Sequence, residues 1–485
     1  MTYFTDIGLE VHAELATRSK MFCACPVVDP ALAQPNQAVC PVCLGLPGTL
    51  PVVNQQAVEF GLRVALALDC TVAPVSIFAR KNYFYPDLPK GYQISQYEEP
   101  LAINGILPVR TSEGVRQIRI RRVHLEEDTG KLTHVHADDG AYSLVDLNRA
   151  GVPLLEIVSE PDLHSLEEVR AYAEGLRNLL RTLGVNSGDM EKGAIRFEAN
   201  VSIRPKGSSE LGTRVEIKNL NSFKAMERAV AYQIGQQSLL LDAGKTVEQE
   251  TLGWDADREV TYSQRSKEEA HDYRYFPEPD LPPLVADPAM VGKIRQNLPE
   301  LPFALQDRLM QQYGIIEAEA CLLAEDKALT RYFETCVQIA DGVPVRTILN
   351  WITGGVFAWI NQTGESINSI KVPPEALIGL LRQVQRKAVN VNTAKSILNE
   401  MLQNGKTALD IIQQNDLQQV SDTGQIAGMV HEVLQSHPKE VQAYMAGKET
   451  LANWLFGQVM RQAGGKADPH LIRTELENQL KNLGS

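Results

Sequence analysis

The stretch Ala194-Ile-Arg-Phe-Glu-Ala-Asn-Val-Ser-Ile-Arg204 alternates apolar and polar side chains along its whole length. Successive side chains of a β-strand point to opposite faces of a sheet, so this period of two predicts a strand with one buried face. The other face carries Glu198 and Asn200, whose side chains can bind ligands. We therefore expect a sheet whose polar face lines a hydrated site.

Two further stretches, residues 5–15 and 213–218, alternate in the same way. In the first of them Glu10 and His12 share the polar side, where side chains two residues apart project about 6.5 Å from each other. Such a pair fits a ligand site, and it fits an ordinary surface strand equally well. Several strands of this kind predict a largely antiparallel sheet with one wet face.

The densest charge lies in His124-Leu-Glu-Glu-Asp-Thr-Gly-Lys131, which places three consecutive carboxylates beside an imidazole. Two like charges 4 Å apart repel each other by roughly 4 kcal/mol at an effective dielectric constant near 20. A divalent cation would compensate such a cluster, with carboxylate oxygens and imidazole as ligands. A solvated acidic turn is the alternative interpretation.

The strand that leads into this segment changes phase. Residues 115–125 alternate, but the alternation breaks between Arg121 and Arg122. We expect a β-bulge there. The pattern therefore leaves open whether Glu126 or Glu127 faces the same side as the polar residues of the first strand.

Four of the seven cysteines fall in one short window. They form two pairs, Cys23 with Cys25 and Cys40 with Cys43, and the second pair reads Cys-Pro-Val-Cys-Leu-Gly. Two close pairs on turn-prone sequence are typical of a structural zinc site with four thiolate ligands. The alternative is four merely buried cysteines. An odd total and this clustering argue against a secreted disulfide framework.

An aromatic loop spans residues 78–97 and contains Lys81, Tyr83 and Lys90. Its prolines and glycine favour an ordered loop over a helix. Stacking and positive charge would suit a nucleotide or the end of a tRNA, and a well-packed surface loop is the open alternative.

Length and composition limit the class of protein. A chain of 485 residues with 44% hydrophobic residues predicts two or three globular domains. No apolar run is long enough for a membrane span and no signal peptide is evident, so we expect a cytoplasmic protein without membrane contact. The net charge of −13 argues against a general nucleic-acid coat. Walker, dinucleotide-binding and nucleophile-elbow motifs are absent from the sequence.

Helical periodicity marks the rest of the chain. Residues 161–183 predict an amphipathic helix, with Ser165 as its cap and Glu168 completing a capping box. After residue 292 short helices are predicted, at residues 390–403, 407–414 and 426–435. The predicted domains are residues 1–292, 293–405 and 406–485.

Long motifs in the chain resemble the family of aspartyl/glutamyl-tRNA(Asn/Gln) amidotransferase B subunits. One of them is Ile7-Gly-Leu-Glu-Val-His-Ala-Glu14. The others are residues 40–48, 81–92, 124–131, 146–153, 212–221 and 273–280. With the helical tail, the resemblance covers essentially the whole chain.

The resemblance implies an α+β fold: a cradle-like, largely antiparallel sheet domain with helices, then a helical domain and a small helical tail that helps hold tRNA. It implies that the chain uses ATP to phosphorylate the side-chain carboxylate of misacylated glutamyl-tRNA(Gln) or aspartyl-tRNA(Asn). Ammonia from the glutaminase, or A-type, subunit would then displace the phosphate, and a small C-type subunit would complete a heterotrimer.

Residue roles follow from combining the resemblance with the charge pattern. The expected magnesium ligands are Glu10, His12, Glu126, Glu127 and Glu198. The expected catalytic residues, which neutralise phosphate charge or act with the metal, are Lys81, Glu127, Arg149 and Lys218. The expected contacts to ATP or substrate are Tyr83, Lys90, His124, Asn200, Asn219 and Arg274. The expected zinc ligands are Cys23, Cys25, Cys40 and Cys43.

The sequence is also compatible with two other functions. A zinc-bearing tRNA-binding subunit without chemistry of its own would account for the cysteines and the tail, but not for the acidic segment. A magnesium-dependent phosphohydrolase acting on a small substrate would account for the carboxylates alone.

Overall fold

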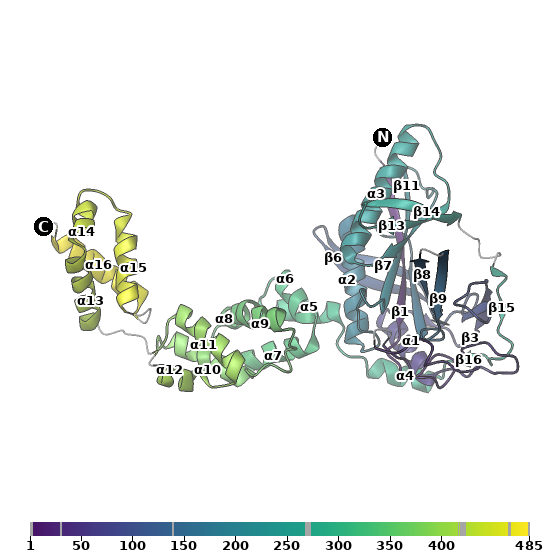
Figure 1. Ribbon diagram of the computed structural model, residues 1–485, viewed down its shortest axis with the longest axis horizontal. Coiled ribbons are helices and arrows are strands. Elements are labelled where there is room, and N and C mark those ends of the chain that lie inside the picture. Colours follow the sequence, from purple (N-terminus) through teal and green to yellow (C-terminus); the bar gives the residue numbers. More distant parts are fainter. Residues whose placement is uncertain are drawn as a thin grey trace. The chain divides into compact units, whose positions relative to one another are not determined.

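The computed structural model divides the chain into two units, Met1–Leu305 and Gln306–Ser485 (Figure 1). It describes residues 3–29, 32–137, 140–266, 273–415, 417, 423–463 and 467–483. The predicted α+β class with a large, mostly antiparallel sheet and a helical C-terminal region is confirmed. No helix among the described residues is both long and apolar enough to cross a membrane.

A nine-stranded sheet forms the centre of the first unit. Neighbouring strands are antiparallel except for β12 and β13, which run parallel. In spatial order the strands are β14 (Val260–Ser266), β13 (Glu250–Asp255), β12 (Val215–Leu220), β11 (Ile195–Pro205), β1 (Tyr3–Glu14), β10 (Pro153–Ser159), β7 (Gly114–Glu127), β6 (Ala102–Thr111) and β2 (Thr71–Val72).

Helices α1 (Gln55–Ala67), α2 (Leu166–Thr182) and α3 (Phe223–Asp242) contribute to one apolar core with this sheet. Ile7, Leu9, Val11 and Ala13 of β1 are all buried in that core, as their alternation predicted. The polar residues between them therefore lie on the opposite face of the sheet.

The predicted bulge in β7 is confirmed. Val158 of β10 pairs with Arg122, and the next residue, Ser159, pairs with Ile120, so Arg121 has no partner in this register. Because a one-residue slip exchanges the two faces of a strand, the bulge sets which side chains after it face the polar side.

The helix predicted at residues 161–183 begins later, at Leu166. Ser165 caps it by accepting a hydrogen bond from the backbone N–H of Glu168, as predicted. The capping box is not formed as predicted, because the Glu168 carboxylate accepts from the backbone N–H of His164 instead of that of Ser165.

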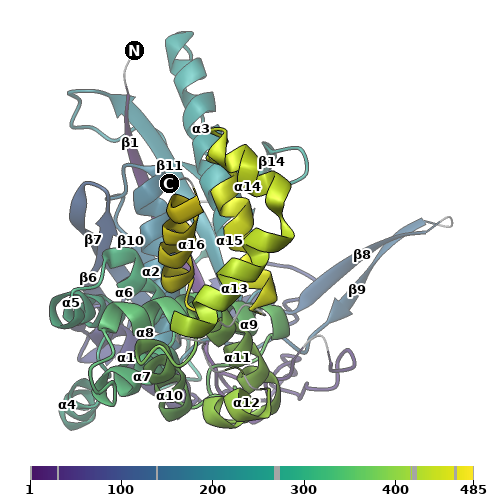
Figure 2. The ribbon, with the colours of Figure 1, turned by 90° about the vertical axis from the view of Figure 1, so that its left-hand side faces the viewer.

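Three small sheets flank the large one. Figure 2 shows one of them, the hairpin of β8 and β9, projecting from the nine-stranded sheet. Their strands are β8 (Lys131–Ala137) with β9 (Gly140–Asp146), β16 (Leu284–Val285) with β3 (Val75–Ser76), and β15 (Phe276–Pro277) with β4 (Ala79–Asn82) and β5 (Tyr92–Ser95).

A buried ion pair ties the last of these sheets together. Glu278 has no exposed side-chain surface, and its two oxygens accept from Arg80 at 2.6 Å and 2.7 Å. The Arg80 guanidinium also lies 4.2 Å from the ring centre of Tyr92. The segment after residue 273 is thus fixed on the aromatic loop.

Replacing Arg80 by Met is expected to lower the free energy of unfolding by about 3–5 kcal/mol, because the Glu278 carboxylate then stays buried without its cation. A urea titration of the full chain, followed by tryptophan fluorescence, measures this loss. Arg119→Met is the matched control, since Arg119 pairs with Asp162 through a largely exposed side chain. Such pairs contribute about 1 kcal/mol or less. Equal losses in the two variants would contradict the importance of burial.

The helices after the sheet domain confirm the predicted periodicity. Helix α4 (Pro288–Gln296) still belongs to the first unit, where Ile294 joins the core. The helices that follow are α5 (Pro302–Tyr313), α6 (Glu317–Ala324), α7 (Lys327–Gln338), α8 (Val345–Trp351), the π-helix η2 (Ile352–Val356), α9 (Phe357–Thr363), α10 (Pro374–Gln385), α11 (Val391–Asn404) and α12 (Ala408–Gln414). Helices α11 and α12 match two of the predicted helices.

The last helices share a core of their own, which includes Val430, Leu455 and Ile472. They are α13 (Thr423–Ser436), α14 (Pro438–Met445), α15 (Leu451–Gln462) and α16 (Pro469–Leu483). Helix α13 contains the third predicted helix. The predicted domain limits at 292 and 405 remain predictions.

Candidate active site

A row of ionisable side chains crosses the polar face of the sheet. His12 of β1 lies directly opposite Glu156 of β10, which in turn lies opposite His124 of β7. Residues opposite each other in antiparallel strands project from the same face with Cβ atoms about 5 Å apart. The register of three strands therefore gathers these groups although they are far apart in the chain.

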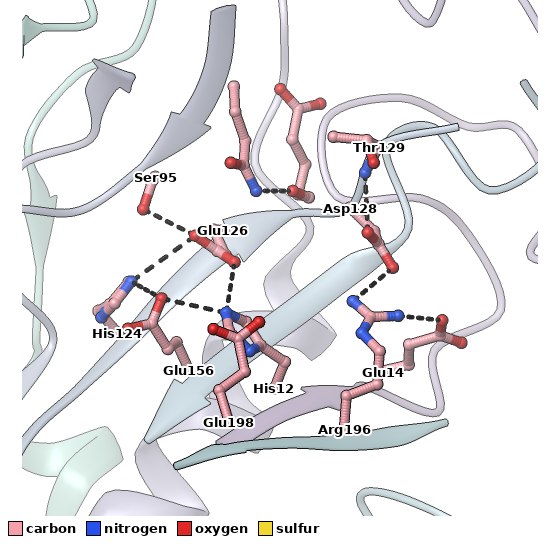
Figure 3. A network of polar contacts seen from close by, with 12 residues as sticks. His12, Glu14, Ser95, His124, Glu126, Asp128, Thr129, Glu156, Arg196 and Glu198 are labelled. Carbon is pink, nitrogen blue, oxygen red and sulfur yellow. Dashed lines mark hydrogen bonds and ion pairs between the residues drawn. The ribbon is translucent and has the colours of Figure 1, made fainter. Parts of the chain in front are cut away.

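His12, Glu126 and Glu156 form a first acidic cluster, in which one possible ligand atom of each residue lies within 4.8 Å of the others. His12 Nε2 is 3.8 Å from Glu126 Oε1 and 3.4 Å from Glu156 Oε2 (Figure 3). The buried imidazole of His124 bridges the same two carboxylates, at 3.3 Å from Glu156 and 3.7 Å from Glu126. Ser95 adds a hydrogen bond of 3.0 Å to Glu126 Oε2.

Glu10, Glu198 and Glu216 form a second acidic cluster, whose oxygens also lie within 4.8 Å of one another. Glu10 lies opposite Glu198 in the register of β1 and β11. The pairing of β11 with β12 brings Glu216 opposite Asn200, beside these two. Both clusters thus arise from the alternation of strands that each bury one face.

Neighbouring polar groups orient the second cluster. Asn200 donates a hydrogen bond of 2.8 Å to Glu10, and the buried hydroxyl of Thr251 donates one of 2.7 Å to Glu216 Oε2. Lys218 Nζ lies 2.7 Å from Glu198 and 3.7 Å from Glu216. These contacts leave the carboxylates ordered before any ligand is bound.

The protonation equilibria reflect a surplus of negative charge. Burial alone lowers the pKa of His12, but its hydrogen bond to Glu156 and the nearby carboxylates outweigh burial and raise that pKa to about 9. Burial opposes ionisation of Glu156, yet the charges of His124 and His12 hold its pKa well below the usual range. A divalent cation that displaced the His12 proton would find ordered carboxylate oxygens here, with the neutral imidazole as a further ligand.

Lys81 lies at the edge of the first cluster, among aromatic rings. Its Nζ is 4.9 Å from the ring centre of Tyr273 and 6.0 Å from that of Tyr83. Burial lowers the pKa of Lys81, but its electrostatic interactions with Tyr275, Glu126 and other neighbours outweigh burial and raise that pKa, so the side chain stays a cation. Within the described part of the chain Lys81 forms no ion pair within 4.0 Å, which leaves its charge available to a ligand.

The four cysteines also meet in space. Cys43 Sγ lies 3.5 Å from that of Cys23, 3.7 Å from that of Cys40 and 3.8 Å from that of Cys25. Four thiolates bound to zinc at about 2.3 Å in a tetrahedron are about 3.8 Å apart, so the observed spacing fits such a site.

A buried cation accompanies the cysteines. Lys20 is fully buried, and its Nζ lies 3.5 Å from Cys43 Sγ and 3.2 Å from the carbonyl oxygen of Leu147. A hydrogen bond from Cys23 outweighs burial and, with the charge of Lys20 also contributing, lowers the pKa of Cys43 to about 4. Burial and the contacts among the cysteines raise the pKa of Cys23 and, to about 11, that of Cys25, so a thiolate is favoured at Cys43 over these two.

Known proteins resemble the chain over its whole length. A family model described as the GatB/GatE catalytic domain matches residues 5–292, and one described as the GatB domain matches residues 331–480. The chain belongs to the family of aspartyl/glutamyl-tRNA(Asn/Gln) amidotransferase B subunits. Relatives of that name from Moorella thermoacetica and Thermodesulfovibrio yellowstonii are 50% and 47% identical, over 99% of this chain and 100% of each relative. One from Thermomicrobium roseum is 48% identical over 99% of both.

The predicted family is therefore confirmed, and with it the prediction that the chain works as a subunit of a tRNA-dependent amidotransferase. Most residues predicted from the resemblance to the B subunits converge on the polar face of the sheet. These are Glu10, His12, Glu126 and Glu198 among the expected metal ligands, together with Lys81, His124, Asn200 and Lys218.

Glu127 and Lys90 do not join either acidic cluster among the described residues. After the bulge, Glu126 faces the polar side, so Glu127 points to the opposite face of β7. There its Oε1 pairs with Lys90 and accepts a 2.9 Å hydrogen bond from the backbone N–H of Ile94. The roles predicted for these two residues in an amidotransferase B subunit remain predictions. In the structure the two side chains form an ion pair with each other.

Three other predicted residues lie in local contacts, and a fourth is exposed. Arg149 donates to the carbonyl oxygens of Thr129 at 3.0 Å and Gly130 at 2.7 Å, so its guanidinium holds the acidic turn. The side chain of Asn219 donates to Tyr262, and Arg274 is exposed. Tyr83 donates a hydrogen bond to Gln93 and faces Lys81.

The sequence prediction missed two carboxylates of the acidic clusters, Glu156 and Glu216. Glu156 sits in the apolar run of residues 154–158, and a lone carboxylate inside such a run is a signal that could have identified it. Glu216 alternates with buried Val215 and Ile217, so the sequence shows which face of the strand it occupies. The sequence does not show that residues of β1 and β11 lie beside it.

Proposed function

We propose that this chain is the subunit in which the side-chain carboxylate of glutamyl-tRNA(Gln) or aspartyl-tRNA(Asn) is phosphorylated by ATP and then amidated. The observation that carries the proposal is the pair of acidic clusters on one polar sheet face, with the cation Lys81 at their edge. Membership of a family of amidotransferase subunits supports the same reaction.

The chemistry explains why such a site is needed. A carboxylate is a poor electrophile because its leaving group would be oxide, and phosphorylation replaces that by phosphate. Phosphoryl transfer depends mainly on positioning and on neutralising charge, which bound magnesium supplies. The residues that would hold the metal ions are Glu10, His12, Glu126, Glu156, Glu198 and Glu216.

The lysines would have different tasks. Lys81 offers a partly buried positive charge to the transferred phosphoryl group or to the acyl phosphate. Lys218 already contacts Glu198 and Glu216, so it would orient these carboxylates and add charge only where a ligand oxygen reaches it. His124 keeps Glu126 and Glu156 in place through its Nε2.

The remaining parts are assigned to assembly and binding. We infer that an amidase subunit of the A type supplies ammonia and that a small subunit of the C type completes a cytoplasmic heterotrimer. The aromatic loop with Tyr83 would contact the aminoacylated end of the tRNA, and the last helices would hold its body. The four cysteines would bind a structural zinc ion that takes no part in the reaction.

The test uses the assembled enzyme. With ammonium chloride in place of glutamine, the wild-type complex is expected to amidate misacylated tRNA, and ATP hydrolysis is expected to depend on that tRNA. Both can be followed by chromatography of the hydrolysed aminoacyl group and by phosphate release. Amidation that fails with ammonium would favour a subunit without chemistry, and ATP hydrolysis independent of tRNA would favour a phosphohydrolase.

A further inference from the structure

The four-cysteine segment contacts a residue of the site region. In the turn that follows Cys43, Gly45 has a positive φ of +64° and packs directly on Lys90. A Cβ atom at Gly45 would lie 2.5 Å from Lys90 Cγ and 3.0 Å from Lys90 Cα. Real Cβ atoms do not approach other carbons this closely, so the contact requires glycine and fixes where Lys90 runs.

Through Lys90, the contact with Gly45 also restricts the position of Glu127 at the end of β7. Its ammonium pairs with Glu127, and both side chains are at least nine-tenths buried. The same Glu127 oxygen accepts the backbone N–H of Ile94, and the carbonyl oxygen of Glu127 accepts from Gln93 at 2.6 Å. The pair therefore holds β5 against the last residues of β7.

The neighbouring residues contact the first acidic cluster and the strand that carries it. Ser95 donates its 3.0 Å hydrogen bond to Glu126, and Gln96 accepts from the backbone N–H of Leu125 at 3.0 Å. Glu126 is adjacent to Glu127 in the chain. Any shift of β5 relative to β7 would thus move the oxygen that Glu126 presents to a cation.

We propose that the four-cysteine turn positions Glu126, through the contact of Gly45 with Lys90 and the ion pair of Lys90 with Glu127. Gly45 and Lys90 are then positioning residues. The inference rests on the proposed role of Glu126 as a cation ligand, and it gives the cysteine site a task beyond local stability. Groups that orient metal ligands from outside typically change metal affinity roughly 10- to 100-fold when lost.

The chain offers a matched pair of variants. Gly48 also has a positive φ, of +84°, but a Cβ atom there would meet nothing within 4 Å among the described residues. Gly45→Ala and Gly48→Ala therefore impose similar backbone strain, and only the first presses on Lys90. We expect Gly45→Ala to weaken Mn²⁺ binding to the assembled enzyme about tenfold, as measured by electron paramagnetic resonance, and Gly48→Ala to leave it unchanged.

Lys90→Met separates positioning from simple charge. Removing a cation close to carboxylates should strengthen Mn²⁺ binding if only Coulomb forces act. If Lys90 positions Glu126, Mn²⁺ binding should weaken instead, and the Gly45→Ala, Lys90→Met double variant should be no weaker than the Lys90→Met variant. Lys90→Met also provides the measurement if Gly45→Ala does not fold.

The outcomes are distinct. Unchanged Mn²⁺ affinity in Gly45→Ala, tighter binding in Lys90→Met, or equal losses in Gly45→Ala and Gly48→Ala would overturn the positioning role. A Glu126→Gln variant measured alongside tests the underlying site. If Glu126→Gln leaves Mn²⁺ binding unchanged, both the cation site and the positioning role are wrong; if it weakens binding while the Gly45 and Lys90 variants do not, only the positioning role is wrong.

Discussion

Glu126→Gln is expected to lower ammonium-driven amidation by about 100-fold or more, without loss of the fold. Glutamine keeps the shape of the side chain and one oxygen that can accept the hydrogen bond from Ser95. It removes the charge that faces His12 and His124. Mutating a residue that only hydrogen-bonds to a metal ligand typically lowers metal affinity or activity roughly 10- to 100-fold. Removing the charge of a ligand itself should therefore lower activity by at least the larger of these factors.

The measurement is single-turnover amidation of misacylated tRNA by the assembled enzyme over a range of Mg²⁺ concentrations. A ligand role predicts that high Mg²⁺ restores part of the rate, and that Glu156→Gln and Glu216→Gln are impaired in the same direction. Glu174→Gln, on the exposed side of α2, is the control and should react like wild type. A full rate in Glu126→Gln at low Mg²⁺ would exclude Glu126 from the site.

For three of the expected ligands, the local sequence shows which face of the strand they occupy but not which residues they lie near. Glu10, His12 and Glu198 stand on strands whose apolar partners are plainly buried, so their side of the strand follows from a period of two. Their closeness does not follow, because it depends on the pairing of β1 with β11 and β10. Such registers are set by tertiary packing.

Glu126 and Glu127 show the limit most clearly. They are adjacent in the chain, and the bulge at Arg121 decides which of them faces the site. Sequence predicted that the phase breaks, but not which face each carboxylate takes after the break. Arg149 shows a second limit, since nothing local indicates that its guanidinium bonds to the carbonyl oxygens of Thr129 and Gly130.

The cysteine cluster was predictable because its ligands are close in sequence and turns bring them together. The double variant Cys40→Ser, Cys43→Ser is expected to reduce bound zinc from about one atom per chain to none, by elemental analysis. We also expect the free energy of unfolding to fall by at least about 5 kcal/mol, since structural zinc contributes roughly 10–16 kcal/mol in small zinc-binding peptides.

The fully buried Lys20 adds to this loss, because its ammonium then faces a neutral hydroxyl at residue 43 in place of a thiolate, beside the Leu147 carbonyl oxygen. Cys321→Ser, outside the cluster, controls for the removal of a thiol and should retain zinc. Zinc retained by the double variant, or absent from the wild-type protein, would contradict the assignment. Because Gly45 follows the cluster directly, zinc loss should weaken Mn²⁺ binding as well as stability, whereas a purely local zinc site would affect stability alone.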